Sequence, residues 1–460
     1  MRSAAVVGGG VAGLAAALDL AAAGADVALL EAGDRLGGKV RTGSLAGVAM
    51  DLGPDSFLAR RPEAVRLCTE LGLAADLVSP AATTAGVWSR GRVRMLPGGQ
   101  VLGVPTDPVA LARSGIVSLV AAARAALEPV WPGRPLPEGE DEAVGALVGR
   151  RFGREVAERL VDPLLGGINA GNTDSLSVDA AAPQLAAAAR RSASLVKGLR
   201  GGPGPAPGPV FLTHPGGRSV LVDALADRLG GLGVTVSRSC PVEGLQARPG
   251  GGYRLTTPGG TLEVDGVVLA VPAPAAAALL DEVDPAAAPP LAAVRAASVV
   301  LVGLAYRAGD APADAVGSGF LVPRPEGRLM TACSWASAKW AHLGADRLVR
   351  LRVSAGRVDD PRAMAMDDDE VVERLRRELA AAVGVEADPV DVVVARWPDG
   401  FPQYAPGHLQ RIAAVHAELD RAAPGVAIAG AGLGGVGIPA CIGSGRAAAT
   451  EVLAALSSTS

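Results

Sequence analysis

The apolar residues near the start of the chain follow the order strand, glycine turn and helix. Residues 4–7 form a short continuous apolar run, glycines follow at 8–10, and residues 11–18 are rich in Ala and Leu. A continuous apolar run suits a parallel strand buried on both faces, and the Ala- and Leu-rich stretch favours a helix. Residues 25–32 contain the next apolar run. The pattern therefore predicts a β-α-β unit.

Strand and helix patterns continue along the chain, with one long helical interruption. Residues 43–57 predict an apolar hairpin. Residues 61–195 carry Ala, Leu and Arg at helical spacing, and a Gly/Pro run follows at 197–210. Strand-like runs return between 296 and 358, and residues 425–456 predict a strand, a glycine loop and a helix.

These patterns predict an α/β fold in which a Rossmann-like nucleotide-binding domain is interrupted by other units. We expect the nucleotide-binding domain to be discontinuous, because its predicted strands occur on both sides of the helical interruption. Its segments are residues 1–60, 211–280 and 420–460. The other predicted parts are an inserted helical domain at 61–196, a Gly/Pro linker at 197–210 and a mixed-sheet substrate domain at 281–419.

Composition and charge narrow the class of protein. With 460 residues, of which 49% are hydrophobic, the chain is long enough for two or three globular units around a large ligand. A net charge of −4, with no Lys/Arg cluster among aromatic residues, argues against nucleic-acid binding. The four cysteines are far apart and no His lies at metal-ligand spacing, so we expect neither disulfides nor a metal site. A cytoplasmic protein fits these features.

Residues 109–127 are the longest apolar stretch of helical character. Arg113 and Arg124 interrupt it, whereas a membrane-spanning helix needs about 20 mostly uncharged residues. We therefore expect a helix within a domain, with membrane contact that is at most peripheral. The N-terminal apolar stretch lacks a basic leader and a cleavage site, so we expect no export signal.

The glycine turn near the N-terminus has the spacing of a dinucleotide-binding motif. Gly8, Gly10 and Gly13 follow the pattern GxGxxG between a predicted strand and a predicted helix. This geometry brings backbone N–H groups and the positive end of the helix to a diphosphate. Glu31 ends the next strand and is placed to accept the hydroxyls of a ribose. These residues leave both NAD and FAD open as ligands.

The sequence RLGGKVRT at 35–42, with a second glycine pair and basic side chains, resembles the FAD-binding signature of the amine oxidase and protoporphyrinogen oxidase superfamily. The resemblance implies FAD as the cofactor and an FAD-binding domain of the p-hydroxybenzoate hydroxylase and amine oxidase type. It also implies that the hairpin backbone and the C-terminal glycine loop approach the flavin ring. The predicted cofactor-binding residues are Gly8, Gly9, Gly10, Val11, Ala12, Gly13, Glu31, Ala32, Lys39, Gly53, Pro54, Asp55, Ser56, Val242, Trp397, Ala431, Val436, Gly437 and Ile438.

Three further stretches narrow the resemblance. PLLGGINAGNTDSLSV at 163–178, CSWASAKW at 333–340 and RWPDGFPQYAPGHLQRI at 396–412 are similar to the protoporphyrinogen and coproporphyrinogen oxidases of heme synthesis, in their bacterial branch. The resemblance implies oxidation of a porphyrinogen to a porphyrin by repeated hydride transfer to flavin N5. Dioxygen then reoxidises the flavin and hydrogen peroxide is released. No catalytic side chain is implied.

The resemblance also implies where the substrate lies. Gly167, Ile168 and Leu321 would contact the macrocycle. Arg60 or Arg61 is the sharpest candidate to bind a propionate, because a guanidinium can grip a carboxylate with two hydrogen bonds. Arg352 would serve an additional carboxylate if it points inward, and strand alternation places Arg350 on the same face. Coproporphyrinogen carries four carboxylates and protoporphyrinogen two, and the bacterial branch favours coproporphyrinogen as the substrate.

Several alternatives stay open at this point. The chain could be a protoporphyrinogen oxidase, or an amine oxidase that uses Lys339 beside Trp335 and Trp340. It could also be a non-catalytic FAD-binding protein. Trp397 either contacts the cofactor or merely locks the last crossing between domains. Family analogy suggests that ferrochelatase receives the product, while the oligomeric state cannot be predicted.

Overall fold

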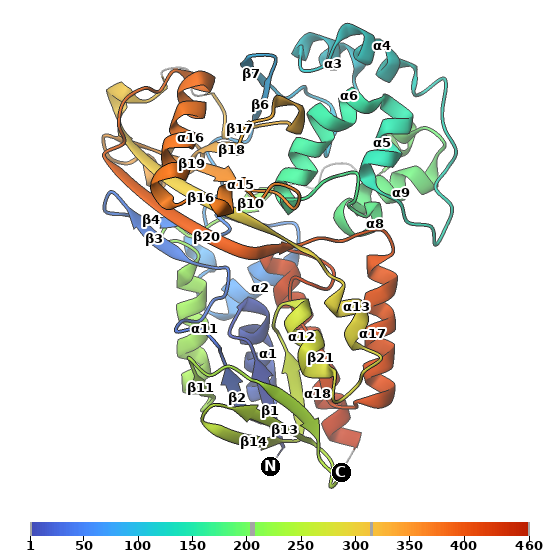
Figure 1. Cartoon of the computed structure of the whole chain (residues 1–460), viewed down its shortest axis with the longest axis vertical. Coiled ribbons are helices and arrows are strands. Elements are labelled where there is room, and N and C mark those ends of the chain that lie inside the picture. Colours follow the sequence, from blue (N-terminus) through green and yellow to red (C-terminus); the bar gives the residue numbers. More distant parts are fainter. Residues whose placement is uncertain (1, 203–207, 313–315, 459–460) are drawn as a thin grey trace.

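The computed structural model describes residues 2–202, 208–312 and 316–458. Its lower half contains a five-stranded parallel sheet with the strand order β11-β2-β1-β15-β21 (Figure 1). The strands are β1 (Ser3–Val7), β2 (Asp26–Leu30), β11 (Thr235–Ser237), β15 (Gly266–Leu269) and β21 (Val426–Ile428). The sheet thus combines strands from both ends and the middle of the chain. A discontinuous α/β domain of this kind agrees with the predicted fold class.

Both faces of the parallel sheet are covered, which explains why its strands are continuous apolar runs. On one face lie α1 (Val11–Ala22), α2 (Pro62–Glu70), α11 (Ser219–Gly231) and α18 (Ile438–Ser458). On the other lie the meander β12 (Gly244–Ala247), β13 (Tyr253–Thr257) and β14 (Gly260–Val264), with α12 (Ala273–Leu280), α13 (Ala288–Ala292) and α17 (His408–Ala422). Ala4 and Val6 point into the first core and Ala5 and Val7 into the second.

A second, seven-stranded mixed sheet lies above the parallel sheet in Figure 1. Its order is β20 (Asp391–Pro402), β16 (Ala296–Arg307), β19 (Leu348–Ala355), β18 (Met330–Trp335), β17 (Gly319–Leu321), β6 (Gly86–Ser89) and β7 (Arg92–Met95). All its pairs are antiparallel except β17 with β6. Helix α16 (Asp368–Val383) covers its outer face and begins with a capping box between Asp367 and Glu370.

Two short helices, α14 (Ala336–Lys339) and α15 (Arg362–Ala365), contact strands of the second sheet, and the remaining helices gather beside it. They are α3 (Pro108–Ser114), α4 (Leu119–Leu127), α5 (Val144–Phe152), α6 (Arg154–Val156), a π-helix (Ala157–Gly166), α7 (Gly167–Asn169), α8 (Val178–Ala181), α9 (Pro183–Arg191) and α10 (Leu195–Arg200). They share their own apolar core. Short β-pairs join the parts: β3 (Thr42–Leu45) with β4 (Val48–Asp51), β5 (Phe57–Leu58) with β10 (Phe211–Leu212), and β8 (Gln100–Val101) with β9 (Val104–Pro105).

The structure corrects several predicted boundaries. The segment 61–196 is not one helical unit, because α2 packs against α18 and strands β6 and β7 join the seven-stranded sheet. The predicted linker at 197–210 begins inside α10, and residues 203–207 lie outside the described residues. Helix α17 packs against one face of the parallel sheet although most of it falls within the predicted substrate domain. Local apolar patterns predicted these elements but not the partners against which they pack.

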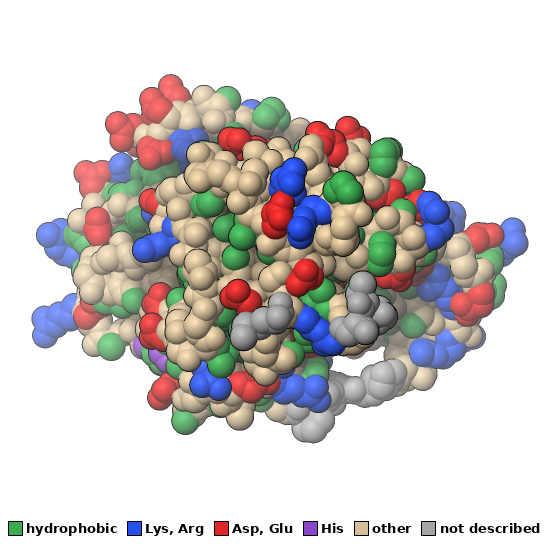
Figure 2. Space-filling model, turned by 90° about the horizontal axis from the view of Figure 1, so that it is seen from below, with side chains coloured by type: hydrophobic (Ala, Val, Ile, Leu, Met, Phe, Trp, Pro, Cys, Tyr) green, Lys and Arg blue, Asp and Glu red, His purple; other side chains and the backbone are tan. Residues whose placement is uncertain are grey.

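Two properties of the whole chain limit the possible functions. Over the described ranges 2–202, 208–312 and 316–458, no helix is long and apolar enough to cross a membrane, and no group of acidic, His or Cys side chains is arranged to hold a metal. Acidic and basic side chains are interspersed on the face that Figure 2 shows, which is the end of the molecule that carries the parallel sheet.

Candidate flavin and substrate site

A cavity of about 570 Å³ lies at the carboxyl ends of the parallel strands, beneath the seven-stranded sheet. Strand ends Val7, Leu30 and Ala270 contribute to its walls, and β1 and β15 lie side by side in the sheet. In open α/β sheets, the crevice outside the carboxyl ends of the strands is where ligands bind. Cavities of roughly 300–1,000 Å³ hold ligands of cofactor size.

The first glycine motif forms the floor of this cavity by close backbone packing. A side chain at Gly13 would place its Cβ 1.9 Å from the carbonyl oxygen of Gly8, so only glycine allows helix α1 to approach this turn. Gly8 itself has a φ of +104°. A Cβ at Gly10 would meet nothing within 4 Å, so this residue leaves open space beside the N-terminus of α1. The structure therefore has the room and positive potential that a diphosphate requires.

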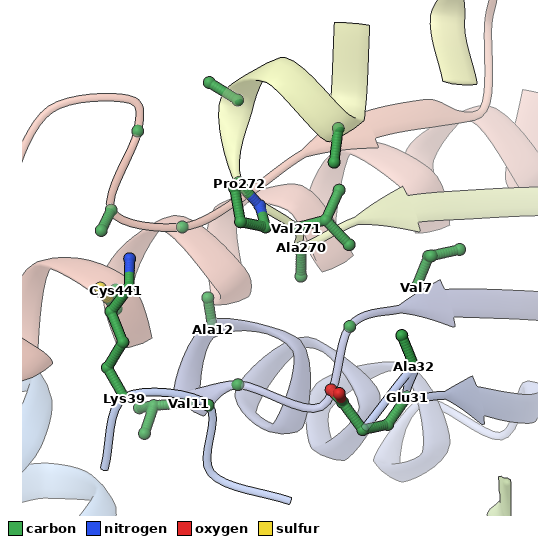
Figure 3. Close-up of a pocket in the computed structure, with 18 of the residues that line it drawn as sticks. Val7, Val11, Ala12, Glu31, Ala32, Lys39, Ala270, Val271, Pro272 and Cys441 are labelled. Atoms are coloured by element: carbon green, nitrogen blue, oxygen red, sulfur yellow. The ribbon is translucent and has the colours of Figure 1, made fainter. Parts of the chain in front are cut away.

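Glu31 lies at the end of the cavity opposite Lys39 (Figure 3). Its Oε2 accepts a hydrogen bond of 2.6 Å from the N–H of Gly9, and its Oε1 accepts one of 2.7 Å from the N–H of Gly33. An ionised carboxylate has about four acceptor positions, so two remain for ribose hydroxyls. Gly9 therefore orients the acidic side chain and does not line the cavity itself.

Lys39 extends from the second glycine pair into the other end of the cavity, beside Cys441 (Figure 3). Burial lowers the pKa of its ammonium group, against the opposing influence of Cys441 and Asp399. Burial also raises the pKa of the Cys441 thiol to about 11. Arg35 instead donates to the carbonyl oxygens of Leu36 and Val40, so it shapes the turn and does not face the ligand.

In the segment that follows β4, Pro54 lines the cavity, whereas Gly53, Asp55 and Ser56 do not. A Cβ at Gly53 would lie 2.0 Å from the carbonyl oxygen of Lys39, which explains the glycine. Asp55 accepts hydrogen bonds from Lys339 at 2.7 Å and from Trp340 at 3.3 Å.

The Asp55 carboxylate is ionised in this environment. Burial favours its neutral form, but Lys339 and Arg352, whose guanidinium lies 3.6 Å away, outweigh that effect and hold the Asp55 pKa well below its usual value. Because Lys339 is held by this ion pair and is absent from the cavity lining, the geometry does not favour the amine oxidase alternative in which it would face a flavin.

The C-terminal glycine loop closes the cavity next to the N-terminus of α18. Ala431, Val436 and Ile438 line the cavity, and Gly437 does not. The Tyr404 hydroxyl donates to the carbonyl oxygen of Ala431. Such fixed backbone positions suit a loop that must present N–H groups and a helix end to a ligand.

Side chains of α17, before the loop, and of α18, after it, tie down the rest of this loop. His408 Nε2 lies 2.9 Å from the carbonyl oxygen of Leu433, and the N–H of Gly430 donates to the Ser444 hydroxyl at 3.0 Å. Burial lowers the pKa of His408, which keeps its imidazole neutral and suited to this contact. His408 thus locks the loop from outside the cavity.

Trp397 was predicted either to contact the cofactor or to lock the last crossing between domains, and its contacts are structural. Its indole N–H donates to the carbonyl oxygen of Leu52 at 2.7 Å, and its ring does not line the cavity. Trp397 therefore locks strand β20 onto the hairpin, while Asp399 of the same strand lines the cavity.

Most predicted cofactor residues meet at one cavity, and several lining residues were missed by sequence reasoning. The predicted residues in the lining are Gly8, Gly10, Val11, Ala12, Glu31, Ala32, Lys39, Pro54, Val242, Ala431, Val436 and Ile438. Val242 lies in the loop between β11 and β12. Missed lining residues include Cys240, Pro241, Val271, Pro272, Val294, Asp399, Gly430 and Cys441. Apart from Asp399, these missed side chains are small or apolar, and no local motif marks them.

The seven-stranded sheet turns a mixed face toward this site. Arg352 pairs with Ser334 in the sheet, and Ser354 pairs with Ala332, which in turn pairs with Leu321. These side chains are half-buried, whereas their strand neighbours on the opposite face are buried under α16. Half-exposed side chains on an inward-facing sheet surface indicate space between the sheet and the cavity below.

The predicted substrate residues are brought together only in part. A Cβ at Gly167 would lie 3.7 Å from a methyl group of Leu321, so these two predicted positions are neighbours. Ile168 follows the π-helix and is 55% exposed, although it is a large apolar residue. Arg60 and Arg61 are exposed at the start of α2.

The two arginines of β19 lie on one face, as strand alternation predicts. Arg350 is fully buried and donates to the carboxylate of Asp346 and to the carbonyl oxygen of Leu45. Arg352 donates to the carbonyl oxygen of Gly53. Both guanidinium groups hold the hairpin in place. Arg352 can therefore bind a substrate only with those N–H groups that do not already donate to the protein.

Comparison with known proteins places this architecture in a family. The family model described as flavin containing amine oxidoreductase matches residues 11–453. The chain belongs to this family. Its members contain a flavin, and the glycine floor, Glu31 and the cavity fit FAD, which is therefore the cofactor of the chain. The predicted fold class and cofactor are confirmed.

Relatives within the family are similar over nearly the whole chain. The coproporphyrinogen III oxidase of Mycobacterium leprae is 40% identical over 457 residues, covering 97% of each chain. The coproporphyrinogen III oxidase of Bacillus subtilis is 32% identical over 463 residues, with the same coverage. A crystallised protein of Exiguobacterium sp., proposed to be a protoporphyrinogen oxidase, has a TM-score of 0.89 and 30% identity and covers 98% of each chain.

Proposed function

We propose that this chain is an FAD-dependent oxidase that converts coproporphyrinogen III to coproporphyrin III, with dioxygen as the electron acceptor and hydrogen peroxide as the product. The observation that carries the proposal is the end-to-end similarity to coproporphyrinogen III oxidases, at 40% identity for the Mycobacterium leprae protein. The human protoporphyrinogen oxidase is 30% identical over 488 residues, which keeps protoporphyrinogen IX as the second candidate substrate.

The bound FAD would supply the hydride acceptor and the reaction with dioxygen. The protein would bind the cofactor and the substrate, orient them and shield them from solvent. We assign the diphosphate to the loop from Gly8 to Gly13 and the ribose to Glu31, because both line the cavity or shape its floor. Lys39, Pro54 and the loop before α18 would surround the flavin ring at the opposite end. Val242 would cover the adenine end of the cofactor.

The macrocycle would lie between the flavin and the inward face of the seven-stranded sheet. Leu321 and Gly167 are neighbours at one edge of this space, which supports their assignment to the ring. Ile168 is exposed beside them, and a bound macrocycle would cover it. The reaction demands little acid-base chemistry from the protein, which agrees with a sheet face that carries small, apolar and hydroxyl side chains beside Arg352.

The propionates would lie at the rim of this space. Arg60 and Arg61 follow the hairpin directly and their side chains are exposed at the start of α2, where a guanidinium can grip a carboxylate with two hydrogen bonds. Arg352 would contribute only to a propionate that passes deep under the sheet, because it already donates to Gly53. We also infer a cytoplasmic location and delivery of coproporphyrin to a ferrochelatase, which would use it as the porphyrin for iron insertion.

The test is aerobic incubation of the purified yellow protein with coproporphyrinogen III and, separately, protoporphyrinogen IX. We expect enzyme-dependent porphyrin fluorescence and peroxide, faster with the tetracarboxylate, and neither product in anaerobic samples. Turnover of protoporphyrinogen alone would reassign the substrate. Full flavin content with no porphyrin from either compound would favour a non-catalytic FAD-binding protein, and amine-dependent peroxide would favour an amine oxidase.

A further inference from the structure

An arginine beside the predicted macrocycle contacts has few partners of its own. The guanidinium of Arg357 donates a hydrogen bond of 2.5 Å to the carbonyl oxygen of Val322. In the described ranges 2–202, 208–312 and 316–458 the nearest carboxylate oxygen is Oδ2 of Asp162, which lies 4.0 Å from Nη1 of Arg357 and so beyond hydrogen-bond distance. A guanidinium has five N–H donors. Most donors of Arg357 therefore have no acceptor among the described residues.

Burial makes this shortage of partners unusual. The side chain of Arg357 is only 12% exposed, and burial, together with the neighbouring charge of Arg324, lowers its pKa to about 10. A group with this pKa is still charged at neutral pH. Arg350, which is fully buried in the same sheet, instead has a carboxylate partner, Asp346, and three backbone carbonyl partners. A largely buried cation with open donors is unfavourable unless an anion reaches it.

The carboxylate of Asp162 is already committed to other donors. Its Oδ1 accepts hydrogen bonds from the N–H and the hydroxyl group of Thr173, each at 3.0 Å, and its Oδ2 accepts one from Nε of Arg324 at 3.1 Å. Arg324 also forms an ion pair with Asp359. Two guanidinium groups thus share the buried charge of Asp162, and Arg324 is the closer one. The charge of Arg357 is left incompletely neutralised.

Arg357 lies where two walls of the predicted substrate space meet. Its acceptor is the residue that follows Leu321, and a Cβ at Gly167 would lie 3.7 Å from a methyl group of Leu321. The N–H of Val358 donates to the carbonyl oxygen of Ala170 at 2.9 Å. Helix α6, which continues into the π-helix, lies next to strand β6 of the sheet in this region (Figure 1). Arg357 is therefore a cation at one edge of the space assigned to the macrocycle.

We propose that Arg357 binds a propionate that coproporphyrinogen carries and protoporphyrinogen lacks. This assignment rests on the proposed function and adds a residue that determines its specificity. A carboxylate can accept two hydrogen bonds from the open side of the guanidinium. At the corresponding position protoporphyrinogen carries an uncharged vinyl group, so its binding would leave the donors of Arg357 unpaired and shut off from solvent. Attraction of one substrate and penalty for the other both favour the tetracarboxylate.

The first measurement is the steady-state turnover of both porphyrinogens by Arg357→Gln. We expect KM for coproporphyrinogen III to rise roughly tenfold with kcat nearly unchanged, because the propionate contact is the same in the ground state and the transition state. KM for protoporphyrinogen IX should not rise. Arg357→Lys keeps the charge but not the two-pronged geometry, and should recover part of the loss. Arg357→Met should lower KM for protoporphyrinogen IX, because an apolar side chain suits a vinyl group.

Binding of the porphyrins to the holoprotein gives a readout that requires no turnover. Coproporphyrin III and protoporphyrin IX carry the same carboxylates as the corresponding porphyrinogens, and quenching of protein fluorescence measures their Kd. In Arg357→Gln the Kd for coproporphyrin III should rise roughly tenfold and become less dependent on ionic strength, whereas the Kd for protoporphyrin IX should not rise.

Variants of two neighbouring arginines separate binding from folding. Arg324→Gln removes the closer partner of Asp162, so we expect a lower Tm and equal changes of KM for both substrates. Arg362→Gln is the matched control, because this exposed guanidinium is paired with Asp360 and should not affect either substrate. In Arg357→Gln, Asp162 keeps its bonds to Arg324 and Thr173, so Tm and flavin absorbance should stay close to those of the original protein.

Two results would overturn the role of Arg357 while leaving the proposed function intact. They are equal increases of KM for both substrates in Arg357→Gln, and unchanged KM and Kd in this variant. Failure of the proposed function looks different, because the original protein would then form porphyrin from neither substrate and would show no preference for coproporphyrin III in the binding assay. That result would withdraw both assignments.

Discussion

The floor and the roof of the active-site region are built on different principles. The floor, which is the glycine turn from Gly8 to Gly13, positions its ligand with backbone groups. Its glycines are required because a Cβ added at Gly13 would lie only 1.9 Å from the carbonyl oxygen of Gly8. The roof is a face of the seven-stranded sheet, where side chains such as Leu321, Ser334 and Ser354 stay half-buried. Few substitutions are compatible with the floor, whereas the roof can change side chains without changing its backbone.

The cyclohexylamine oxidase of Brevibacterium oxydans is 20% identical and shares the fold with a TM-score of 0.72. The two proteins therefore share the arrangement of the two sheets although four fifths of the aligned residues differ. The predictions below test the two regions separately, beginning with the floor.

The largest effect is expected from Gly13→Ala. The added methyl group would meet the backbone of Gly8 and the side chain of Ala270, so the turn and α1 must separate. We expect a loss of about 3 kcal/mol or more in the free energy of unfolding, together with loss of FAD. Chemical denaturation and flavin absorbance measure both. The matched control is Gly10→Ala, where the methyl group enters open space: the apoprotein should keep its stability and only FAD affinity should fall.

Glu31 tests the ribose end of the floor. Glu31→Ala removes the acceptor of two backbone N–H groups, from Gly9 and Gly33, and of the predicted ribose hydroxyls. We expect the Kd for FAD to rise roughly 10- to 100-fold, measured by titration of the apoprotein and quenching of flavin fluorescence. Asp34→Asn, an exposed neighbour, is the control. An unchanged Kd in Glu31→Ala would remove the carboxylate from the cofactor site.

The floor could be predicted from the sequence because its requirements appear locally. Gly8, Gly10 and Gly13 carry the turn, and Glu31 ends the adjacent strand. Trp397 and Arg352 could not be placed in this way, because their contacts with Leu52 and Gly53 join segments more than two hundred residues apart. The prediction of residues 61–196 as one inserted helical domain was wrong for the same reason, because parts of this segment pack against elements that are distant in the sequence.

Asp55 lies between the floor and the roof, and from its ion pairs we expect the free energy of unfolding to depend on pH. Its folded-state pKa lies below the unfolded value, so it stabilises the fold above about pH 4 and loses this contribution as the pH falls below that value. Asp55→Asn should cost about 2 kcal/mol at pH 7, because Lys339 and Arg352 lose their carboxylate partner.

The measurement is the free energy of unfolding from pH 7 to pH 3 for the original protein and for Asp55→Asn. The difference between them should shrink in acid, because the Asp55 carboxyl group of the unfolded chain takes up a proton while that of the folded protein stays ionised. Asp76→Asn, at an exposed position, serves as the control. A difference that stays constant over the whole range would show that the charge of Asp55 does not contribute.

The smallest effect is expected for Arg60 and Arg61, which we call the rim, at the edge of the space under the seven-stranded sheet. Arg60→Ala and Arg61→Ala leave the cofactor cavity untouched, because neither side chain lines it. If either binds a propionate, KM for coproporphyrinogen should rise roughly fivefold with kcat nearly unchanged, since this interaction is the same in the ground state and the transition state. The rise should be smaller for protoporphyrinogen, which has fewer carboxylates to lose a partner. The control is Arg66→Ala, at an exposed position further along α2. An equal KM in all three variants would assign the propionates to the sheet instead of the rim.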